Sequence, residues 1–309
     1  MKLIAVSRTM RDLLRQARRY ATVDATVLIT GETGVGKDAL ARYLHASGPR
    51  KREPFVTVDC PALPETLVEA ELFGHERGAF TDATVARPGR FEMAGHGTLY
   101  LDAVTRLSSA GQGALLRVVE ERRVTRLGGT HATDVRARLI ASSAMGVEQA
   151  VDDGSLRADL FHRLSVLPVL IPPLRERTED ILPLAHACLS EVAERLEREP
   201  PRLSPGAEDA LIRYHWPGNV RELRHALERL LLAGVGDEIK ADALPIEILE
   251  GKEAYLAPGT ERRPTLADVE RRYIELTLTY VRGNQTRAAA ILGISRKALW
   301  EKRKRFGLR

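Results

Sequence analysis

The sequence has few cysteines and no long apolar run. Cys60 and Cys188 are the only two cysteines among 309 residues. They are too few and too far apart for a disulfide framework or a cysteine-based metal site, which favours a reducing compartment. No apolar run approaches the roughly 20 residues that span a bilayer, and nothing at Met1 resembles a signal peptide. These absences exclude a disulfide-stabilised secreted scaffold and a membrane-spanning protein, and they predict a cytoplasmic protein.

The composition is that of an ordered globular protein, although aromatic residues are sparse. Apolar residues make up 44% of the chain, charged residues 29% and aromatic residues 5%. This length suffices for two or three compact units. The net charge of +5 is unevenly distributed, because residues 286–309 hold eight Lys or Arg residues and one acid, Glu301. The basic end indicates contact with nucleic acid.

A glycine-rich loop lies between a predicted strand at 26–30 and a predicted helix at 38–44. Its glycines let backbone N–H groups surround phosphates, and its lysine reaches the outer phosphate charges, as in a P-loop. The N-terminus of the following helix adds favourable partial charge. We therefore predict a nucleotide site rather than a structural glycine turn. The loop residues are Gly31, Glu32, Thr33, Gly34, Val35, Gly36, Lys37 and Asp38.

Further short apolar runs alternate with helical stretches. This alternation predicts an α/β fold in which helices cover a parallel sheet. Asp102 directly follows one of these runs and is expected to hold Mg²⁺. The next residue is Ala103, so the glutamate that often positions the attacking water in such sites is missing. The predicted strands cover residues 55–58, 98–101, 138–141 and 166–170.

Composition and periodicity divide the chain into four segments. Residues 1–175 are predicted to form an α/β nucleotide-binding subdomain, because the strands stop after Pro173. Residues 176–249 keep helical periodicity and are predicted to form a helical lid. Residues 250–264 lack apolar periodicity and are predicted to be a linker. Residues 265–309 are predicted to form a helix-turn-helix domain.

The helix-turn-helix prediction depends on spacing and on capping residues. A second helix can start at Asn284, and a third can be capped by Ser295 after a turn at Gly293. The apolar residues that recur at helical spacing in the first helix are Leu266, Val269, Tyr273, Leu276 and Tyr280.

Six motifs give the chain a specific resemblance to the central AAA+ domain of the sigma-54-dependent transcription activators, the bacterial enhancer-binding proteins. They occupy residues 31–38, 71–83, 89–94, 161–163, 172–177 and 216–223. The stretch 283–300 looks like the Fis-type DNA-binding domain that ends these proteins. The resemblance implies an AAA+ P-loop parallel sheet with a helical lid subdomain, followed by an all-α helix-turn-helix domain. It also implies ATP or ADP with Mg²⁺ as ligands.

The resemblance assigns roles to several charged residues. The family has an acidic residue after the P-loop lysine, so Asp38 is close to its pattern. Arg157 and Arg163 would be arginine fingers that reach a neighbouring subunit's nucleotide, and Arg221 would sense the γ-phosphate. Because arginine fingers act between subunits, the resemblance implies self-association to a dimer or a hexameric ring.

The expected DNA contacts lie in the second and third helices of the tail. The resemblance places residues 295–305 in the major groove of double-stranded DNA at upstream promoter sites. Arg296 and Lys297 are best placed for bases or backbone, and residues 302–305 for phosphates. The candidate DNA-binding residues are Thr286, Arg287, Ser295, Arg296, Lys297, Trp300, Lys302 and Arg303.

Three departures from the family pattern fall around the γ-phosphate. Ala103 replaces the glutamate of the Walker B pair, and its methyl group can neither orient nor deprotonate water. Ala144 aligns with the sensor asparagine. Asp59 aligns with the asparagine that couples nucleotide state to the missing glutamate. Removing one catalytic group typically costs roughly 10² to 10⁴ in rate, which weighs against neutral drift in a working ATPase.

A fourth departure falls in the loop with which the family engages sigma-54. The loop consists of Gly78, Ala79, Phe80, Thr81, Asp82 and Ala83. Asp82 adds a charge and a side chain where the family's glycine permits unusual backbone angles. Phe80 and Thr81 remain, so engagement of sigma-54 RNA polymerase is expected to be weakened rather than abolished.

Three hypotheses follow for the function. The first is a DNA-binding transcription regulator that binds ATP or ADP with weak or absent hydrolysis. The second is an active ATPase that remodels sigma-54 RNA polymerase; an Asp59 carboxylate standing in for the missing glutamate would favour it. The third, a non-transcriptional P-loop ATPase or chaperone, leaves the basic helix-turn-helix unexplained.

The position of the P-loop bears on control. It begins about thirty residues into the chain. We therefore expect no N-terminal receiver or ligand-sensing domain, and control through a partner protein, the expression level or a missing segment.

Overall fold

The computed structural model describes residues 3–81, 83–144, 146–250, 265–280 and 284–307. Contacts between residues divide the chain into one compact unit of residues 1–245 and a second of residues 246–309. No helix in the described part of the chain is long and apolar enough to cross a membrane.

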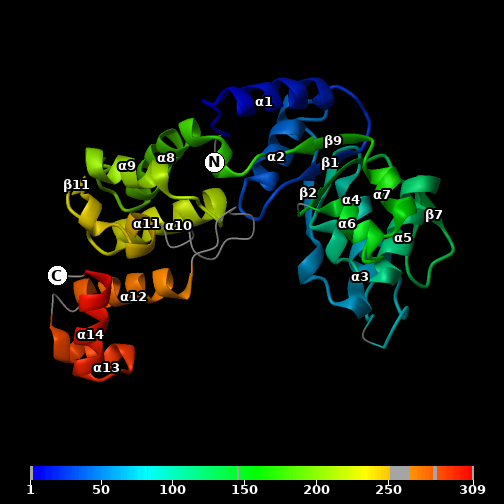
Figure 1. Ribbon diagram of the computed structural model, residues 1–309. Coiled ribbons are helices and arrows are strands. Elements are labelled where there is room, and N and C mark those ends of the chain that lie inside the picture. Colours follow the sequence, from blue (N-terminus) through cyan, green and yellow to red (C-terminus); the bar gives the residue numbers. More distant parts are fainter. Residues whose placement is uncertain (1–2, 82, 145, 251–264, 281–283, 308–309) are drawn as a thin grey trace. The chain divides into compact units, whose positions relative to one another are not determined.

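A five-stranded parallel sheet forms the centre of the first unit (Figure 1). The strand order is β2-β5-β8-β1-β9, and every pairing within it is parallel. This confirms the parallel sheet and the α/β fold predicted from the alternating apolar runs. The strands are β1 (Val27–Thr30), β2 (Phe55–Asp59), β5 (Thr98–Asp102), β8 (Arg138–Ser143) and β9 (Leu167–Leu170).

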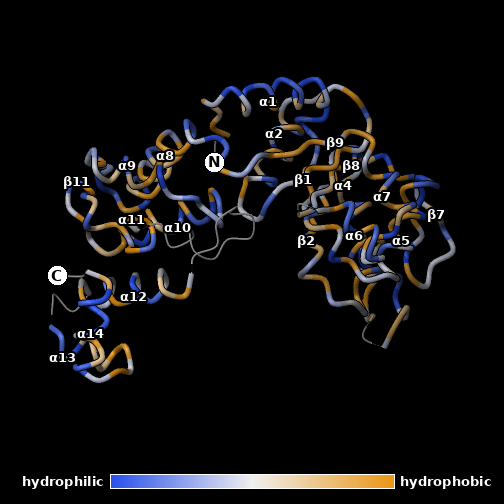
Figure 2. The backbone as a smooth tube through the Cα atoms, viewed as in Figure 1, coloured by the Kyte–Doolittle hydropathy of each residue, from blue (hydrophilic) through white to orange (hydrophobic). Residues whose placement is uncertain are grey.

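Alternate strand residues pack into separate cores on the two faces of the sheet. Ile29, Tyr100 and Ile140 pack with α1 (Arg8–Ala21) and α2 (Lys37–Ser47). Leu28, Leu99, Leu101, Leu139 and Ala141 belong to the other core. Because both faces are covered, the strands read as continuous apolar runs, which Figure 2 shows along the central strands.

The second core is completed by shorter helices and flanked by two small antiparallel hairpins. The helices are α3 (Val68–Phe73), α4 (Arg90–Ala94), α5 (Ser109–Glu121), α6 (Val147–Asp152) and α7 (Ala158–Leu164). The hairpins pair β3 (Gly74–His75) with β4 (Arg87–Pro88) and β6 (Arg123–Thr125) with β7 (Ala132–Asp134). The first unit also contains short 3-10 turns at Cys60–Ala62, Glu65–Leu67, Val104–Arg106, Leu174–Glu176, Thr178–Asp180 and Ala241–Ala243.

The lid is helical, as predicted, with one short addition. Its helices are α8 (Ile181–Arg195), α9 (Pro205–Arg213) and α10 (Asn219–Leu232). The expectation that strands stop after Pro173 is wrong, because β10 (Arg202–Leu203) pairs with β11 (Glu238–Ile239). Two-residue strands carry no period that a sequence pattern could reveal. Fully buried Trp216 donates from Nε1 to the Leu211 carbonyl at 2.8 Å and anchors the lid core.

The second unit is a small helical domain. It contains α11 (Ile246–Glu250), α12 (Leu266–Tyr280), α13 (Gln285–Leu292) and α14 (Arg296–Phe306). The Asn284 side chain accepts from the Arg287 N–H, and Ser295 Oγ from the Ala298 N–H, both at 3.1 Å. Gly293 ends α13 with φ +66°. The predicted caps and turn are therefore present; the predicted linker lies outside the described residues except for Glu250.

The face that α12 buries differs from the predicted one. Ile274 and Leu278 form the core with Leu299, whereas Leu266 is 89% exposed and Tyr273 is 56% exposed. Leu266 and Tyr273 of the periodic set therefore lie off the buried face. Packing against α13 and α14, which the period of one helix cannot specify, selects the buried face.

Candidate nucleotide site

A cavity of about 700 Å³ lies at the carboxyl end of the sheet, where the P-loop, β5 and the lid meet. Its volume falls in the range of pockets for small organic ligands, about 300–1,000 Å³. Nine residues singled out in the sequence line it together, namely Thr33, Gly34, Gly36, Lys37, Asp38, Asp102, Ala103, Ala144 and Arg221.

Lys37 is the first residue of α2 and lies at the floor of this cavity. Its ammonium group donates to the carbonyls of Gly31 at 2.7 Å and Glu32 at 3.0 Å. Burial lowers the pKa of Lys37, while the charge of Asp102 raises it and that of Arg221 lowers it further. A partly buried cation at a helix N-terminus is a favourable position for an anion.

Two hydroxyl groups fix the carboxylate of Asp102. Its Oδ1 accepts from the Tyr100 hydroxyl at 3.0 Å and from the Ser142 hydroxyl at 2.5 Å. Ser142 Oγ also accepts from the backbone N–H of Ala103 at 2.9 Å. Burial raises the pKa of Tyr100, which keeps its hydroxyl protonated as a donor. The sequence analysis missed both residues, because they stand inside apolar strand runs.

The three departures from the family pattern lie at or beside the cavity. Ala103 and the exposed Ala144 both line the cavity. Ala103 adopts a left-handed backbone with φ +54°. Asp59 pairs in register with Asp102 across β2 and β5, so the two carboxylates lie on the same face of the sheet. Asp59 is not one of the residues that line the cavity.

The lid is tied to the P-loop by the start of α10. Asn219 is fully buried, and its amide donates to the Glu32 carboxylate at 3.0 Å and to the Thr33 carbonyl at 3.1 Å. Its oxygen accepts from the Leu174 N–H at 2.7 Å. Arg175 pairs with Glu32 at 2.6 Å and, through this hydrogen bond, lowers the pKa of Glu32. The lid therefore closes one wall of the cavity through a buried polar network.

The cavity also holds basic residues that the sequence analysis did not single out. Arg106, Arg224 and His225 line it beside Lys37 and Arg221. Arg224 pairs with Glu191 at 2.5 Å. Arg106 lies on the 3-10 turn that follows Ala103, its side chain is exposed, and it forms no ion pair within the described part of the chain. Arg106 lies on a short turn just after Asp102, and such a turn is too short to show the residue periodicity by which the sequence reveals helices and strands.

The two predicted arginine fingers lie outside this cavity. Arg157 pairs with Asp159 at 2.8 Å and Arg163 with Glu120 at 3.1 Å, and all four side chains are largely exposed. Neither arginine lines the cavity.

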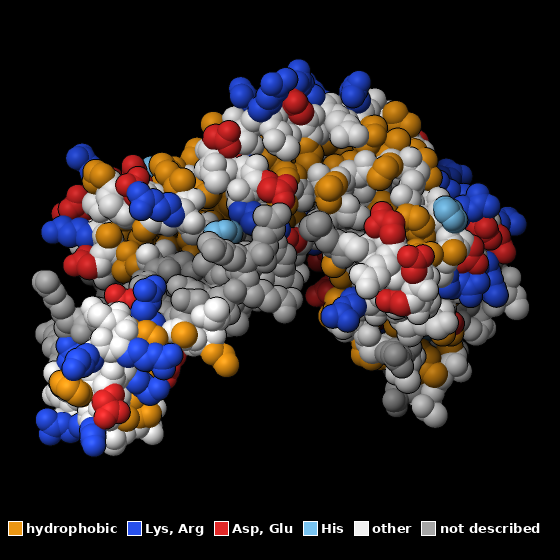
Figure 3. Space-filling model, viewed as in Figure 1, with side chains coloured by type: hydrophobic (Ala, Val, Ile, Leu, Met, Phe, Trp, Pro, Cys, Tyr) orange, Lys and Arg blue, Asp and Glu red, His pale blue; other side chains and the backbone are white. Residues whose placement is uncertain are grey.

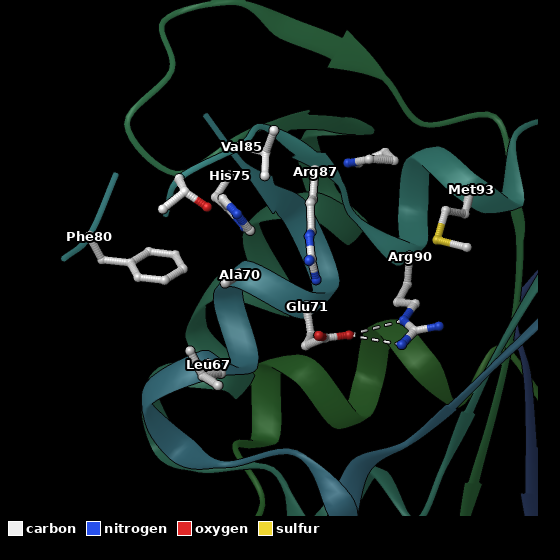
Figure 4. A pocket seen from close by; sticks show the side chains of 11 residues that line it. Leu67, Ala70, Glu71, His75, Phe80, Val85, Arg87, Arg90 and Met93 are labelled. Carbon is white, nitrogen blue, oxygen red and sulfur yellow. Dashed lines mark hydrogen bonds and ion pairs between the residues drawn. The ribbon is translucent and has the colours of Figure 1, made fainter. Parts of the chain in front are cut away.

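The predicted sigma-54 loop projects between β3 and β4. Phe80 is 36% exposed and packs edge-on against His75 with ring centroids 4.9 Å apart. It borders a cavity of about 480 Å³, across which Arg90 pairs with Glu71 at 2.8 Å (Figure 4). The Gly78 N–H donates to the Ala83 carbonyl at 2.8 Å and closes the loop. Asp82 lies outside the described residues.

The predicted DNA-binding residues lie on α13 and α14. Six of them have exposed side chains, namely Thr286, Arg287, Ser295, Arg296, Lys297 and Trp300. Trp300 is 56% exposed and lies under the Lys304 ammonium at 5.4 Å. Lys302 instead forms an ion pair with Glu270 of α12, and Arg303 is half-buried. Lys302 and Arg303 are therefore less accessible than expected, because both pack toward the domain's own helices.

Comparison with known families covers almost the entire chain. Residues 3–170 match the sigma-54 interaction domain family. Residues 175–259 match the AAA+ ATPase lid domain, and residues 265–306 the bacterial regulatory protein, Fis family.

Individual proteins are similar over the same length. Transcriptional regulatory protein ZraR of Klebsiella oxytoca is 44% identical over 300 residues, covering 97% of this chain and 68% of ZraR. Regulatory protein AtoC of Escherichia coli is 40% identical, covering 98% of this chain and 67% of AtoC. The crystal structure of NtrX from Brucella abortus in complex with ADP has a TM-score of 0.74 and 34% identity, covering 99% of this chain and 70% of NtrX. A structure of the same protein with ATP has a TM-score of 0.73, 35% identity and coverage of 99% and 69%.

We predict that Gly34→Ala destabilises the first unit. Gly34 has φ +80°, and an added Cβ would lie 2.2 Å from the Gly218 carbonyl oxygen. The P-loop would have to separate from α10, at an expected cost of about 2–4 kcal/mol. Urea unfolding measures this change. The control is Gly113→Ala in α5, where an added Cβ meets nothing within 4 Å; equal unfolding midpoints for the two variants would contradict the prediction.

Proposed function

The chain belongs to the family of sigma-54-dependent transcriptional regulators, and we propose that it is a member that binds ATP or ADP but hydrolyses ATP slowly or not at all. One observation carries this proposal: the cavity keeps Lys37, Asp102 and Arg221 but has the methyl groups of Ala103 and Ala144 on its wall.

Nucleotide binding is supported by the charges of the cavity and by a relative. The Lys37 ammonium, the N-terminus of α2 and the Arg221 guanidinium supply positive charge for a polyphosphate. NtrX of Brucella abortus has been crystallised with ADP and with ATP. We propose the equivalent cavity of this chain as the site for the same nucleotides.

The chemistry of the site also suits Mg²⁺. This ion is usually held by one or two carboxylates and completes its shell with phosphate oxygens and water. Asp102 is one such carboxylate, oriented by Tyr100 and Ser142. We propose that Asp102 holds Mg²⁺ together with the nucleotide, where the ion would neutralise phosphate charge.

Slow hydrolysis is expected because two alanines stand where the family has polar groups around the terminal phosphate. Water attack needs a group that orients the nucleophile, and neither Ala103 nor Ala144 offers a polar side-chain atom. Asp59 is the only nearby replacement that the sequence suggested, and it lies beside Asp102 without lining the cavity. Nucleotide would then act as an assembly ligand rather than as fuel.

Assembly into a ring is supported by the position of the two arginine fingers. Arg157 and Arg163 do not line the cavity of their own chain, and each is held by an exposed ion pair. Such pairs contribute little, about 0–1 kcal/mol, and can exchange for a phosphate partner. We propose that each arginine can contact nucleotide bound to a neighbouring subunit.

The second candidate function is the active ATPase that remodels sigma-54 RNA polymerase. The partly exposed Phe80 on a closed loop favours it, since this loop retains an apolar contact residue. The two candidates share DNA binding and differ in turnover.

We predict that ATP turnover stays at or barely above the background of Lys37→Ala, although the wild-type chain binds the nucleotide. Ala103→Glu, which restores a carboxylate next to Asp102, is expected to raise the rate by about tenfold or more, since a positioned base contributes roughly 10² to 10⁴. A steady-state phosphate-release assay over a range of protein concentrations measures both rates.

Turnover in the wild type that rises with protein concentration and disappears in Lys37→Ala would establish the active ATPase. In that case, an unchanged rate in Asp59→Asn would exclude Asp59 as the base.

Arg106→Gln should weaken the binding of a triphosphate more than that of a diphosphate. Arg106 has no ion-pair partner in the described part of the chain and lines the cavity near Ala103. Loss of one charge-assisted contact is expected to raise the Kd for ATPγS by about tenfold and to leave that for ADP nearly unchanged. Calorimetry with both nucleotides tests this. Arg117→Gln on α5 is the matched control, and equal effects of the two variants would show that Arg106 does not contact the nucleotide.

Deleting residues 265–309 should abolish sequence-specific DNA binding. The basic α14 is expected to contact bases and phosphates, so affinity should also fall steeply with salt. Selection of bound duplexes from a random library, followed by titration of the selected duplex at several salt concentrations, measures both properties. Specific binding that survives the deletion, or an affinity that is flat between low and moderate salt, would refute the assignment.

A further inference from the structure

Helix α1 carries a row of arginines that takes no part in the nucleotide site. Five of its fourteen residues are arginine, and all five are exposed. With about 100° between successive helical residues, these five fall within an arc of roughly 100°. We call this set the arginine face; it consists of Arg8, Arg11, Arg15, Arg18 and Arg19.

The opposite side of α1 packs against the sheet. Met10, Leu13 and Ala17 are buried in the core shared with β1 and β8. The arginine face therefore points to solvent and is held in place by a buried side of the same helix. Figure 3 shows Lys and Arg side chains gathered over α1.

Helix stability and ion pairing explain only part of this charge, since Arg18 and Arg19 in the last turn suit the helix dipole. The first turn of α1 contains no acidic residue, and Arg8 and Arg11 lie near its N-terminus, where positive charge opposes the helix dipole. Asp12 is the single acid of the helix; it lies 4.0 Å from Arg8 and also pairs with Arg15. The Arg8 and Arg15 side chains remain 91% and 79% exposed.

The spacing of the arginines suits a duplex backbone. From Arg8 to Arg18 the helix rises about 15 Å at roughly 1.5 Å per residue. Along a duplex axis, about four phosphates of one strand occupy the same length. Arginine binds phosphate through a planar fork of donors, and a helix fixed on a folded core presents several such forks at little entropic cost.

We propose that the arginine face is a second DNA-contact surface that binds the phosphate backbone of a duplex without reading its sequence. This inference rests on the proposed function, because the helix-turn-helix domain of the same chain brings the duplex. Once one unit is bound, the duplex is present at high effective concentration for the other, so weak contacts suffice. That tethering favours DNA over an acidic protein as the partner.

The test uses the full chain and a mixed-sequence duplex of roughly 60 base pairs. One variant replaces Arg8, Arg11, Arg15 and Arg18 with Gln, which keeps helix propensity while removing charge. The control removes the same charge from scattered exposed positions of the first unit by replacing Arg117, Arg202, Arg213 and Arg229 with Gln. Circular dichroism and thermal unfolding establish that both variants are folded.

The dependence of log Kobs on log salt concentration is the readout. Each lost phosphate contact reduces the magnitude of this slope by about 0.9. The slope of the α1 variant should therefore be smaller in magnitude than that of the wild type by about 2–4. The control should change by less than about 1. Equal slopes for the α1 variant and its control would overturn the proposal. Unchanged duplex binding with lost binding to poly-glutamate would also overturn it, by assigning the surface to an acidic protein. A wild-type chain that binds no duplex at any salt concentration would instead refute the proposed function.

Discussion

The contact between the P-loop and the start of helix α10 is the constraint on which the nucleotide cavity depends. A Cβ on Gly34 would lie only 2.2 Å from the Gly218 carbonyl oxygen, and buried Asn219 bonds to both Glu32 and Thr33. This network places Arg221 of the lid in the same cavity as Lys37. Buried polar networks rigidify when every member is satisfied, so these hydrogen bonds favour a fixed contact between the lid and the P-loop.

In the proposed function, the chain keeps groups that would bind nucleotide, whereas Ala103 and Ala144 offer no polar side chain that could activate water. Asp102 is oriented by Tyr100 and Ser142, and Ser142 also binds the Ala103 N–H, so the end of β5 is rigid although the Walker B glutamate is missing. Binding and turnover thus depend on different residues of one cavity. A regulator can keep nucleotide-dependent assembly with DNA binding at its C-terminal helices and on α1 while losing hydrolysis.

Much of this arrangement could be predicted from the sequence, because it follows from local rules. Continuous apolar runs identified the buried parallel strands, and capping residues at Asn284 and Ser295 located the helices of the second unit. The roles of Tyr100 and Ser142 could not be predicted, since each looks like a strand residue until β5 and β8 pair. The same holds for Asn219, whose P-loop partners Glu32 and Thr33 are 187 and 186 residues away in sequence. Tertiary packing likewise determined the buried face of α12.

The central claim is that the chain binds ATP and cleaves it slowly or not at all. Its most direct test is a single-turnover measurement: the full chain, in excess over MgATP, is incubated for hours, and the bound nucleotide is released and identified by chromatography. The account predicts intact ATP bound to the wild type and none retained by Lys37→Ala. Conversion of bound ATP to ADP and phosphate within minutes, abolished by Lys37→Ala, would contradict it.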